Sequence, residues 1–412
     1  METIYVCGVG ITPFGRYPDK SIKQLTREAV NAALQDANCQ IEDVEAAYFS
    51  ASTTGYLQGQ SFVPGQIALR GMGFEGIPMY NLENACASGS SAFNLAGQAL
   101  RAGDQDIVLA VGAEKMFIED KARMLGVFDS GWDIETLQQN KEKLLALGQG
   151  VEVPEGSTSP KPYSVFMDVY AAFCRQHMRN FGTTQRQIAA VCAKNHQHSV
   201  HNPNAQFQDA YTIEQVLAAP PITYPLTLPM CAPISDGSAA VILCTQAGLK
   251  KLGGDSNRAI RVLASIVQTG SGRDPADYNN HITAVAARKM YEQAGVGPQE
   301  VDVVEVHDAT AMGEIIQAEN LQLVPFGEAG PAAERGEFTI GGRVPINPSG
   351  GLESRGHPIS ATGLAQIHEL VTQLRGEAGA RQVDGAKVAV QENGGGLYGY
   401  EEAVAVLNMF AR

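Results

Sequence analysis

The chain of 412 residues is 44% hydrophobic and 18% charged, and its formal net charge is −14. This composition supplies a large core and excludes a disordered chain, and the acidity, with no basic run, excludes general nucleic-acid binding. No stretch approaches the roughly 18 apolar residues of a membrane span and no leader-like segment opens the chain, so we expect no membrane association. Seven widely spaced cysteines without a C-x-x-C pair favour reduced thiols in a cytoplasmic protein.

The first part of the chain alternates short apolar runs with amphipathic stretches. The apolar runs predict buried strands at 4–11, 46–52 and 106–114. The amphipathic stretches predict helices at 21–37 and 90–103, and Gly103 is placed to end the second helix. A turn then leads into an apolar run at 235–244, which we expect to close the first sheet.

The last part of the chain repeats this rhythm. It predicts strands at 261–270, 301–309, 386–396 and 401–409, the third of them running into a glycine turn. Helices are expected at 282–295 and 361–376. Alternating buried strands and helices favour an α/β fold with helices on both faces of each sheet.

The repeat predicts two similar βα halves. The N-terminal half is expected to span residues 1–115 plus about 226–257, and the C-terminal half residues 258–412. Between them, residues 116–225 break the rhythm with a charged segment, a loop-prone stretch and the only tryptophan, Trp132. We interpret this segment as an inserted loop subdomain.

Cys86 stands in a tract of small side chains, A-C-A-S-G-S-S-A, which opens the helix expected at 90–103. A small buried core residue is one interpretation, because most cysteines pack in this way. A nucleophile is the other, because free N–H groups at a helix N-terminus stabilise a thiolate and can hold an oxyanion. Cysteine suits acyl transfer between thiols, since the covalent adduct remains an activated thioester.

Two histidines stand where they could serve such a thiol. His357 lies in N-P-S-G-G-L-E-S-R-G-H-P-I-S-A-T-G, a run rich in glycine and proline that brings backbone close to a ligand. His307 follows a buried strand, at the sheet edge where α/β ligand sites lie. A solvent-facing histidine is the alternative interpretation for each of them.

The terminal motif Q-E-N-G-G-G places Glu392 at the end of an apolar strand. Either its charge escapes to solvent or its carboxylate points into a site, where Gly394 or Gly395 would offer an N–H group to an oxyanion.

Two further motifs are weak. N-H-Q-H-S-V-H contains His196, His198 and His201, but the spacing fits no common zinc site and no carboxylate is adjacent, so we expect no metal. V-C-G-V-G after the first residues lacks the third glycine of a dinucleotide loop.

Together the motifs resemble the thiolase superfamily, most closely its sterol-carrier-protein-type and bacterial or archaeal acetyl-CoA acetyltransferase-like branch. The likeness runs over nearly the full length. It rests on NACASGSSA, EKM after a buried strand, K-N-H with N-P-N-A, the SDGSAAV turn, the HDA block, the His357 block and N-G-G-G. The resemblance implies a thiolase fold, five-layered αβαβα, built from two similar halves with an inserted loop region.

The resemblance also implies roles for the site residues. Cys86 matches the nucleophile and His357 the base that deprotonates it. His307 matches an oxyanion-hole histidine for the second substrate, and Gly394, with the Cys86 amide, matches a second oxyanion hole.

One departure from the family stands out. Thiolases usually carry a second cysteine, in C-x-G-G-G or H-D-C-F, but this chain has E-N-G-G-G and H-D-A-T. Counting back from the glycines puts Glu392 in the first slot, and Ala309 occupies the other. We expect Glu392 to act as the acid/base in place of that cysteine, with its pKa raised by apolar surroundings.

The expected function is CoA-dependent cleavage of a 3-oxoacyl-CoA, or the reverse Claisen condensation, through an acyl-Cys86 intermediate. The resemblance extends to enzymes for branched or aromatic substrates of the benzoylsuccinyl-CoA type. The alternatives are a non-catalytic acyl-CoA-binding or scaffold subunit and a decarboxylating ketoacyl synthase-like enzyme. We expect no permanently bound cofactor, with CoA and acyl-CoA as substrates, a homodimer or larger assembly, and a small zinc-ribbon/OB-fold subunit as a candidate partner.

Overall fold

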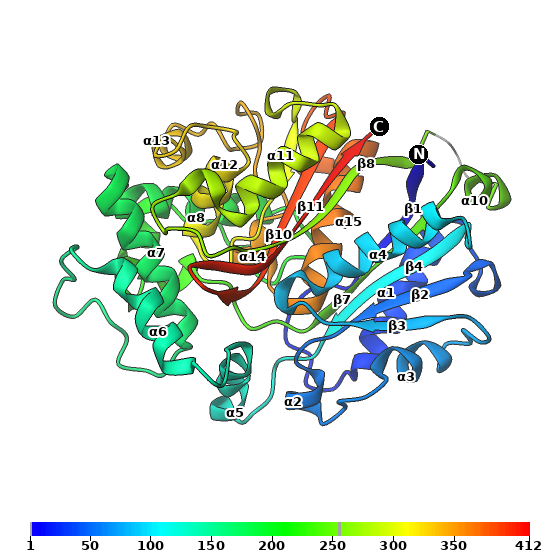
Figure 1. Ribbon diagram of the computed structural model, residues 1–412, viewed down its shortest axis with the longest axis horizontal. Coiled ribbons are helices and arrows are strands. Elements are labelled where there is room, and N and C mark those ends of the chain that lie inside the picture. Colours follow the sequence, from blue (N-terminus) through cyan, green and yellow to red (C-terminus); the bar gives the residue numbers. More distant parts are fainter. Residues whose placement is uncertain (1, 254–256) are drawn as a thin grey trace.

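The computed structural model describes residues 2–253 and 257–412 (Figure 1), so residues 254–256 of the expected N-terminal half lie outside the described residues. Strands of the main sheet are β1 (Ile4–Ile11), β2 (Ala46–Ser50), β3 (Met79–Leu82), β4 (Ile107–Glu114), β7 (Gly237–Cys244), β8 (Ile260–Thr269), β9 (Val303–Glu305), β10 (Val388–Tyr398) and β11 (Glu401–Ala411). A separate pair is formed by β5 (Pro221–Thr223) and β6 (Leu226–Thr227).

The helices fall into three groups along the chain. Those of the first part are α1 (Ile22–Asp36), α2 (Thr54–Gln58), α3 (Pro64–Arg70), α4 (Ser88–Ala102) and, later, α10 (Gln246–Lys251). The middle segment forms α5 (Lys121–Gly126), α6 (Leu137–Leu145), α7 (Val165–Phe181), α8 (Gln185–Ser199) and α9 (Ile213–Ala218). The last part forms α11 (Ile282–Ala294), α12 (Ala311–Asn320), α13 (Ala329–Glu334), α14 (Gly351–Arg355) and α15 (Thr362–Arg375).

The strand order in the described sheet is β3-β2-β4-β7-β1-β8-β11-β10-β9. Its two parts meet where β1 pairs with β8 over only three residue pairs, from Ile4↔Val262 to Val6↔Ile260. Most expected elements are found within a few residues of their predicted bounds, because each is marked by a strong apolar period. The exact limits of the two halves stay a prediction.

Two expectations for the strands are wrong. The 235–244 run does not close the sheet, because β7 lies between β4 and β1 and pairs antiparallel with both. All eight of its residues are buried, as suits a central strand. The glycines of 394–396 do not form a turn either, since they lie inside β10 and pair with β11 up to Tyr398↔Glu401.

Helices cover both faces of the sheet, and three hydrophobic cores lie between the helices and the strands. One core lies between α1 and the outer face of β4 and β7, and includes Ala33 and Leu109. A second core surrounds α4 and α15 and includes Phe93 and Leu370. A third lies between β10–β11 and the helices α8, α11 and α12. The succession helix, sheet, paired helices, sheet, helix agrees with the expected αβαβα layering (Figure 1).

The central helices α4 and α15 approach closely at their N-terminal ends. A Cβ atom on Gly89 would lie 2.5 Å from the backbone oxygen of Ser360, and one on Gly363 would overlap the Ser90 hydroxyl. Glycine is therefore required at both positions, because a Cβ atom would collide with the facing backbone at Gly89 and with buried polar side chains at Gly363. This contact brings the tract around Cys86 next to the segment that carries His357.

Motifs far apart in the sequence are joined by buried ion pairs. Lys115 of the EKM motif lies 3.1 Å from Asp236 of the SDGSAAV turn. The other oxygen of Asp236 accepts hydrogen bonds from the N–H groups of Met116 and Phe117. Lys194 of K-N-H lies 2.8 Å from Glu314 on α12. The charged residues of these motifs therefore hold segments that are distant in the sequence against one another.

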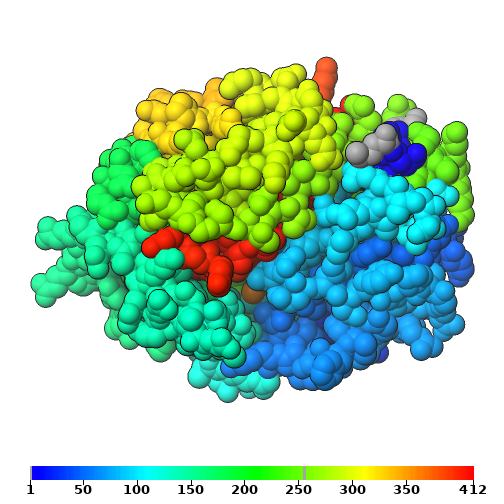
Figure 2. Space-filling model, in the orientation of Figure 1, coloured from blue at the N-terminus to red at the C-terminus, as the bar shows by residue number. Residues whose placement is uncertain are grey.

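The middle segment lies beside the β10–β11 hairpin. Figure 2 shows the hairpin, in red, between the teal surface of that segment and the yellow-green surface of the following helices. None of the helices in the described ranges combines the length and apolarity that crossing a lipid bilayer requires.

We expect Asp236→Ala to lower the free energy of unfolding by about 3–5 kcal/mol, because it leaves the buried Lys115 charge uncompensated. Urea denaturation followed by circular dichroism measures this change. Asp129→Ala is the control, because its ion pair with Lys141 is solvent-exposed and is worth about 1 kcal/mol or less. Equal effects of the two substitutions would contradict the role given to Asp236.

Candidate active site

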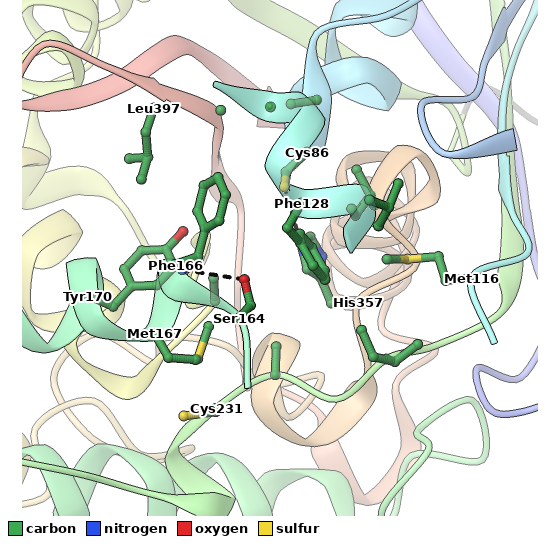
Figure 3. A pocket seen from close by; sticks show the side chains of 18 of the residues that line it. Cys86, Met116, Phe128, Ser164, Phe166, Met167, Tyr170, Cys231, His357 and Leu397 are labelled. Carbon is green, nitrogen blue, oxygen red and sulfur yellow. Dashed lines mark hydrogen bonds between the residues drawn. The ribbon is translucent and has the colours of Figure 1, made fainter. Parts of the chain in front are cut away.

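A cavity of about 1540 Å³ opens beside the N-terminal end of α4. Its wall includes Cys86, His307 and His357, together with Gly394 and parts of α7 and the β10–β11 hairpin. Figure 3 shows Cys86 and His357 together, opposite Phe166, Met167 and Tyr170 of α7. The structure thus brings the three predicted reactive residues to one wall. The Cys86 sulfur and one ring nitrogen of each histidine all lie within 4.8 Å of one another.

Cys86 lies in a short 3₁₀ turn, Ala85–Ala87, that leads into α4. Ala85 has a φ of +47°, a left-handed conformation that non-glycine residues rarely adopt. The Ser88 hydroxyl holds this turn by accepting from Asn84 N–H at 2.8 Å and donating to Ala85 oxygen at 2.6 Å. A strained turn fixed in this way presents the sulfur to the cavity.

His357 is positioned as a proton acceptor for this sulfur. Its Nε2 lies 3.3 Å from Cys86 Sγ, and its Nδ1 lies 2.7 Å from the Thr362 hydroxyl. That hydroxyl donates its own hydrogen to Pro358 oxygen at 3.1 Å, so it accepts from His357. The proton of the neutral ring is therefore on Nδ1, and Nε2 presents a lone pair to the thiol.

His307 is held in the opposite tautomer by a chain of side-chain hydrogen bonds. Gln391 donates to the Ser90 hydroxyl at 2.7 Å, and that hydroxyl donates to Asn393 Oδ1 at 2.7 Å. The amide nitrogen of Asn393 therefore faces His307 and donates to Nδ1 at 3.1 Å. The ring proton of His307 is then on Nε2, so this ring is a hydrogen-bond donor.

Burial keeps these groups neutral. It raises the pKa of the Cys86 thiol to about 12, against a smaller lowering by the backbone N–H of Gly396. It lowers the pKa of His357 well below its usual value, with the nearby His307 and Arg355 adding to the effect. It lowers the pKa of His307 to about 4. At neutral pH the resting site therefore holds a thiol and two neutral imidazoles.

The backbone amides at the sulfur come from two segments. The N–H groups of Cys86 itself and of Gly396 both act on the Cys86 sulfur and favour its anionic form. Gly394, the predicted amide donor, lies on the cavity wall two residues earlier. The glycine run fits tightly there, since a Cβ on Gly395 would lie 2.8 Å from Ala87 nitrogen.

Glu392 is fully buried, and it is not among the residues that line the cavity. One of its oxygens accepts from the backbone N–H of His307 at 2.9 Å, and the other has no partner among the described residues. Burial raises the pKa of Glu392 well above its usual value, and nearby Glu402 adds to this. Its acid/base role stays a prediction, while the contact that it makes positions the backbone of His307.

The other histidines and glycines of the sequence analysis have structural roles. His198 donates from Nδ1 to Asn347 oxygen at 3.0 Å and accepts at Nε2 from Ile340 N–H at 3.2 Å. His196 packs against Tyr211 and also lines the cavity. Gly8 and Gly10 lie within β1, where a Cβ would collide with the backbone of α1. Neither the metal interpretation nor the dinucleotide interpretation gains support from these contacts.

Several residues of the site were not identified from the sequence. Thr362 and Asn393 lie inside the quoted motifs. Their polar side chains, five residues after His357 and directly after Glu392, could have indicated hydrogen-bond partners for the site. The aromatic wall gave no such signal, because its members are scattered through the middle segment. They are Phe128, Trp132, Tyr163, Phe166, Tyr170, Phe207 and Tyr211.

Comparisons with known proteins agree with the fold and with the resemblance seen in the sequence. Residues 4–215 match the family described as "Thiolase, N-terminal domain", and residues 265–409 match "Thiolase C-terminal domain-like". A solved structure, "Ltp2-ChsH2(DUF35) aldolase", superposes with a TM-score of 0.76 over 98% of this chain and 97% of the other, at 20% identity. At that identity the structural likeness supports the fold alone.

Three curated relatives are similar over most of the chain. "Sterol carrier protein 2" of Homo sapiens is 38% identical over 95% of this chain and 70% of its own length. "Acetyl-CoA acetyltransferase" of Methanothermobacter thermautotrophicus is 36% identical over 100% of both chains. "Benzoylsuccinyl-CoA thiolase subunit BbsB" of Thauera aromatica is 33% identical over 92% of this chain and 91% of its own. On these matches and this fold, the chain belongs to the thiolase family of acyltransferases.

Proposed function

We propose that the protein is an acyl-CoA C-acyltransferase that works through an acyl-Cys86 thioester. It would cleave a 3-oxoacyl-CoA with CoA, or run the reverse Claisen condensation. The observation that carries the proposal is the 3.3 Å distance between Cys86 Sγ and His357 Nε2, the nitrogen that bears the lone pair. This geometry supports a thiol that loses its proton as the sulfur attacks, since a resting thiolate is disfavoured by burial.

In the first half-reaction the Cys86 sulfur attacks the carbonyl carbon of an acyl-CoA, and the thiol proton passes to His357 Nε2. The N–H groups of Cys86 and Gly396 both act on the sulfur, and we propose that they receive the negative carbonyl oxygen, with Gly396 in the role expected of Gly394. The bond between the acyl carbon and the CoA sulfur then breaks, and that sulfur leaves with the proton from His357.

In the second half-reaction the α-carbon of another acyl-CoA loses a proton and attacks the acyl-Cys86 carbonyl. His307 Nε2–H is the donor that we propose for the enolate oxygen, because the Asn393 chain keeps its proton on that nitrogen. The C–S bond to Cys86 breaks as the C–C bond forms. Thiolysis is the same path in reverse.

The acyl group that we propose is bulky and apolar, aromatic or branched. The cavity is much larger than an acetyl group needs, and its α7 side is formed by Phe166, Met167 and Tyr170. Arg16 and Lys121 are the Lys or Arg side chains that line it within the described residues, and we propose that they meet the CoA phosphates. The name of the Thauera aromatica relative is consistent with an aromatic substrate.

A partner subunit also remains a proposal. One relative is named as a subunit, and the solved neighbour's name joins Ltp2 to ChsH2(DUF35). Homodimer formation and the cytoplasmic location stay predictions. The absence of the family's second cysteine is the one sequence feature that favours the non-catalytic rival. Malonyl-CoA, included in the acyl-CoA panel below, tests the decarboxylating rival.

The first prediction concerns the covalent intermediate. Incubation with a panel of acyl-CoAs is expected to add one acyl group to the protein at Cys86, seen by intact-protein mass spectrometry and peptide mapping. Cys86→Ala should abolish the adduct, whereas Cys231→Ala, which removes another thiol of the same cavity, should keep it. If the wild-type protein gains no acyl group from any member of the panel, it is a non-catalytic subunit.

A second prediction tests the tautomer of His357. Thr362→Val removes the hydroxyl that accepts from His357 Nδ1. We expect kcat to fall at least about tenfold, with little change in KM, because a positioned general base contributes about 10²–10⁴-fold. Thr362→Ser should restore most of the rate. Unchanged kcat in the valine variant would show that Thr362 does not fix the ring.

A third prediction concerns the aromatic wall. Phe166→Ala should lower kcat/KM for a phenyl-bearing 3-oxoacyl-CoA by about tenfold or more, since lost apolar contact in a substrate pocket is worth about 1–3 kcal/mol. The value for acetoacetyl-CoA should change little. Ile134→Ala, an exposed apolar side chain of the same segment, serves as the control. An equal loss with both substrates would argue against an acyl pocket at Phe166.

A further inference from the structure

We propose that Glu402 is the catalytic acid/base that removes the α-proton of the second acyl-CoA and returns it during thiolysis. This inference rests on the proposed function and concerns the same cavity. Glu402 lies at the start of β11, opposite Leu397 on β10, and its side chain lines the cavity together with Cys86, His307 and Gly394.

The side chain of Glu402 fills the space in front of Gly394. A Cβ atom on Gly394 would lie 2.7 Å from Glu402 Cγ, so the glycine leaves room for the carboxylate to fold over the β10 backbone. Two residues further on, the Gly396 N–H is directed at the Cys86 sulfur. The same short stretch of β10 therefore connects the carboxylate with the acyl-carrying thiol.

One carboxylate oxygen of Glu402 is held and the other is left without a partner. Oε1 accepts from Gln317 Nε2 at 3.2 Å, and the Gln317 carbonyl is in turn occupied by Asn320 at 3.1 Å, which fixes the amide orientation. Oε2 has no hydrogen-bond partner among the described residues. The Nε2 atom of His281 lies 3.6 Å from Oε2, beyond hydrogen-bond length.

The groups around the carboxylate permit a proton to be both taken and returned. Burial, with a smaller contribution from Glu401, raises the pKa of Glu402 to about 7, against the lowering by its own backbone N–H and by Arg273. The titratable and charged groups that face it from the packed elements are His281 at the N-cap of α11, Glu401 of β11, Arg273 after β8, Glu392 of β10 and Tyr170 of α7. A pKa near the working pH is the optimum for general acid–base catalysis.

The proposed step balances without a further reactant. The α C–H bond of the acyl-CoA breaks, its proton moves to the Glu402 carboxylate, and the electron pair forms the enolate. The enolate carbon bonds to the acyl-Cys86 carbonyl carbon, and the Cys86 sulfur leaves as a thiolate. That thiolate takes up one proton from solvent and Glu402 releases one, so that both groups return to their starting protonation states. During thiolysis the protonated Glu402 returns its proton to the α-carbon of the departing acyl-CoA.

Glu402 is better placed for this step than Glu392, because Glu392 is fully buried and does not line the cavity. Tyr170 also lines the cavity, but burial raises the pKa of its phenol well above 10, so it is not a base at neutral pH.

The test measures α-proton exchange apart from Cys86 acylation. Wild-type protein and the Glu402→Gln, Glu402→Asp, Glu392→Gln and Asp133→Asn variants are incubated with acetyl-CoA in D₂O. Deuterium in recovered acetyl-CoA and the acetyl adduct on Cys86 are both followed by mass spectrometry. Asp133→Asn is the matched control, because Asp133 lines the same cavity and an asparagine keeps its hydrogen-bond acceptor.

Glu402→Gln is expected to acylate Cys86 as the wild type does but to lose exchange by at least about 100-fold, in line with the contribution of a positioned base. Glu402→Asp should recover part of the exchange, and the control should retain it. In the wild type, exchange should rise with pH through about 7, because only the deprotonated carboxylate accepts a proton. That rise should be absent from the residual exchange of Glu402→Gln.

Unchanged exchange in Glu402→Gln overturns the inference, and so does a loss confined to Glu392→Gln. Loss of acylation together with exchange in Glu402→Gln also counts against it, because it indicates a structural role. Absence of acylation in the wild-type protein with every member of the acyl-CoA panel would instead refute the proposed function itself.

Discussion

A single contact, between a thiol and an imidazole 271 residues apart, depends on how the two central helices meet. Around it, buried hydroxyls connect the N-terminal ends of α4 and α15. The Ser360 hydroxyl lies 2.9 Å from that of Ser52 and donates to Glu114 at 2.7 Å, and Ser52 reaches Ser88 at 3.0 Å. Small side chains and glycines at this seam keep the backbones close enough for Cys86 and His357 to touch.

Burial then decides the protonation of the whole site. Burial disfavours the charged form of each reactive group, so we expect proton transfer to accompany the attack on bound substrate. The direction of each proton is set by neighbours that do not react: Thr362 turns His357 into an acceptor, and the Asn393 chain turns His307 into a donor. Two identical side chains in one cavity thereby receive opposite tasks.

The hairpin β10–β11 and the middle segment complete this arrangement from the other side. The hairpin brings the Gly396 amide to the sulfur and places Glu402 over Gly394. The middle segment adds Phe166 and Tyr170 from α7, which form the apolar face opposite the reactive residues (Figure 3). The reactive residues and the apolar face opposite them are therefore supplied by different parts of the chain.

The sequence by itself determined the strands and helices with strong apolar periods, from β1 to β11, because local periodicity is a property of neighbouring residues. It also indicated Cys86, His357 and His307, since each stands in a motif whose composition is unusual for packing. It could not determine that β7 lies in the middle of the sheet or that Gly394–Gly396 continue a strand, because pairing partners are chosen between distant segments. Only the tertiary structure decided which carboxylate reaches the cavity: Glu392 and Glu402 lie on one hairpin, and the fold of that hairpin buries the first and brings the second to the wall.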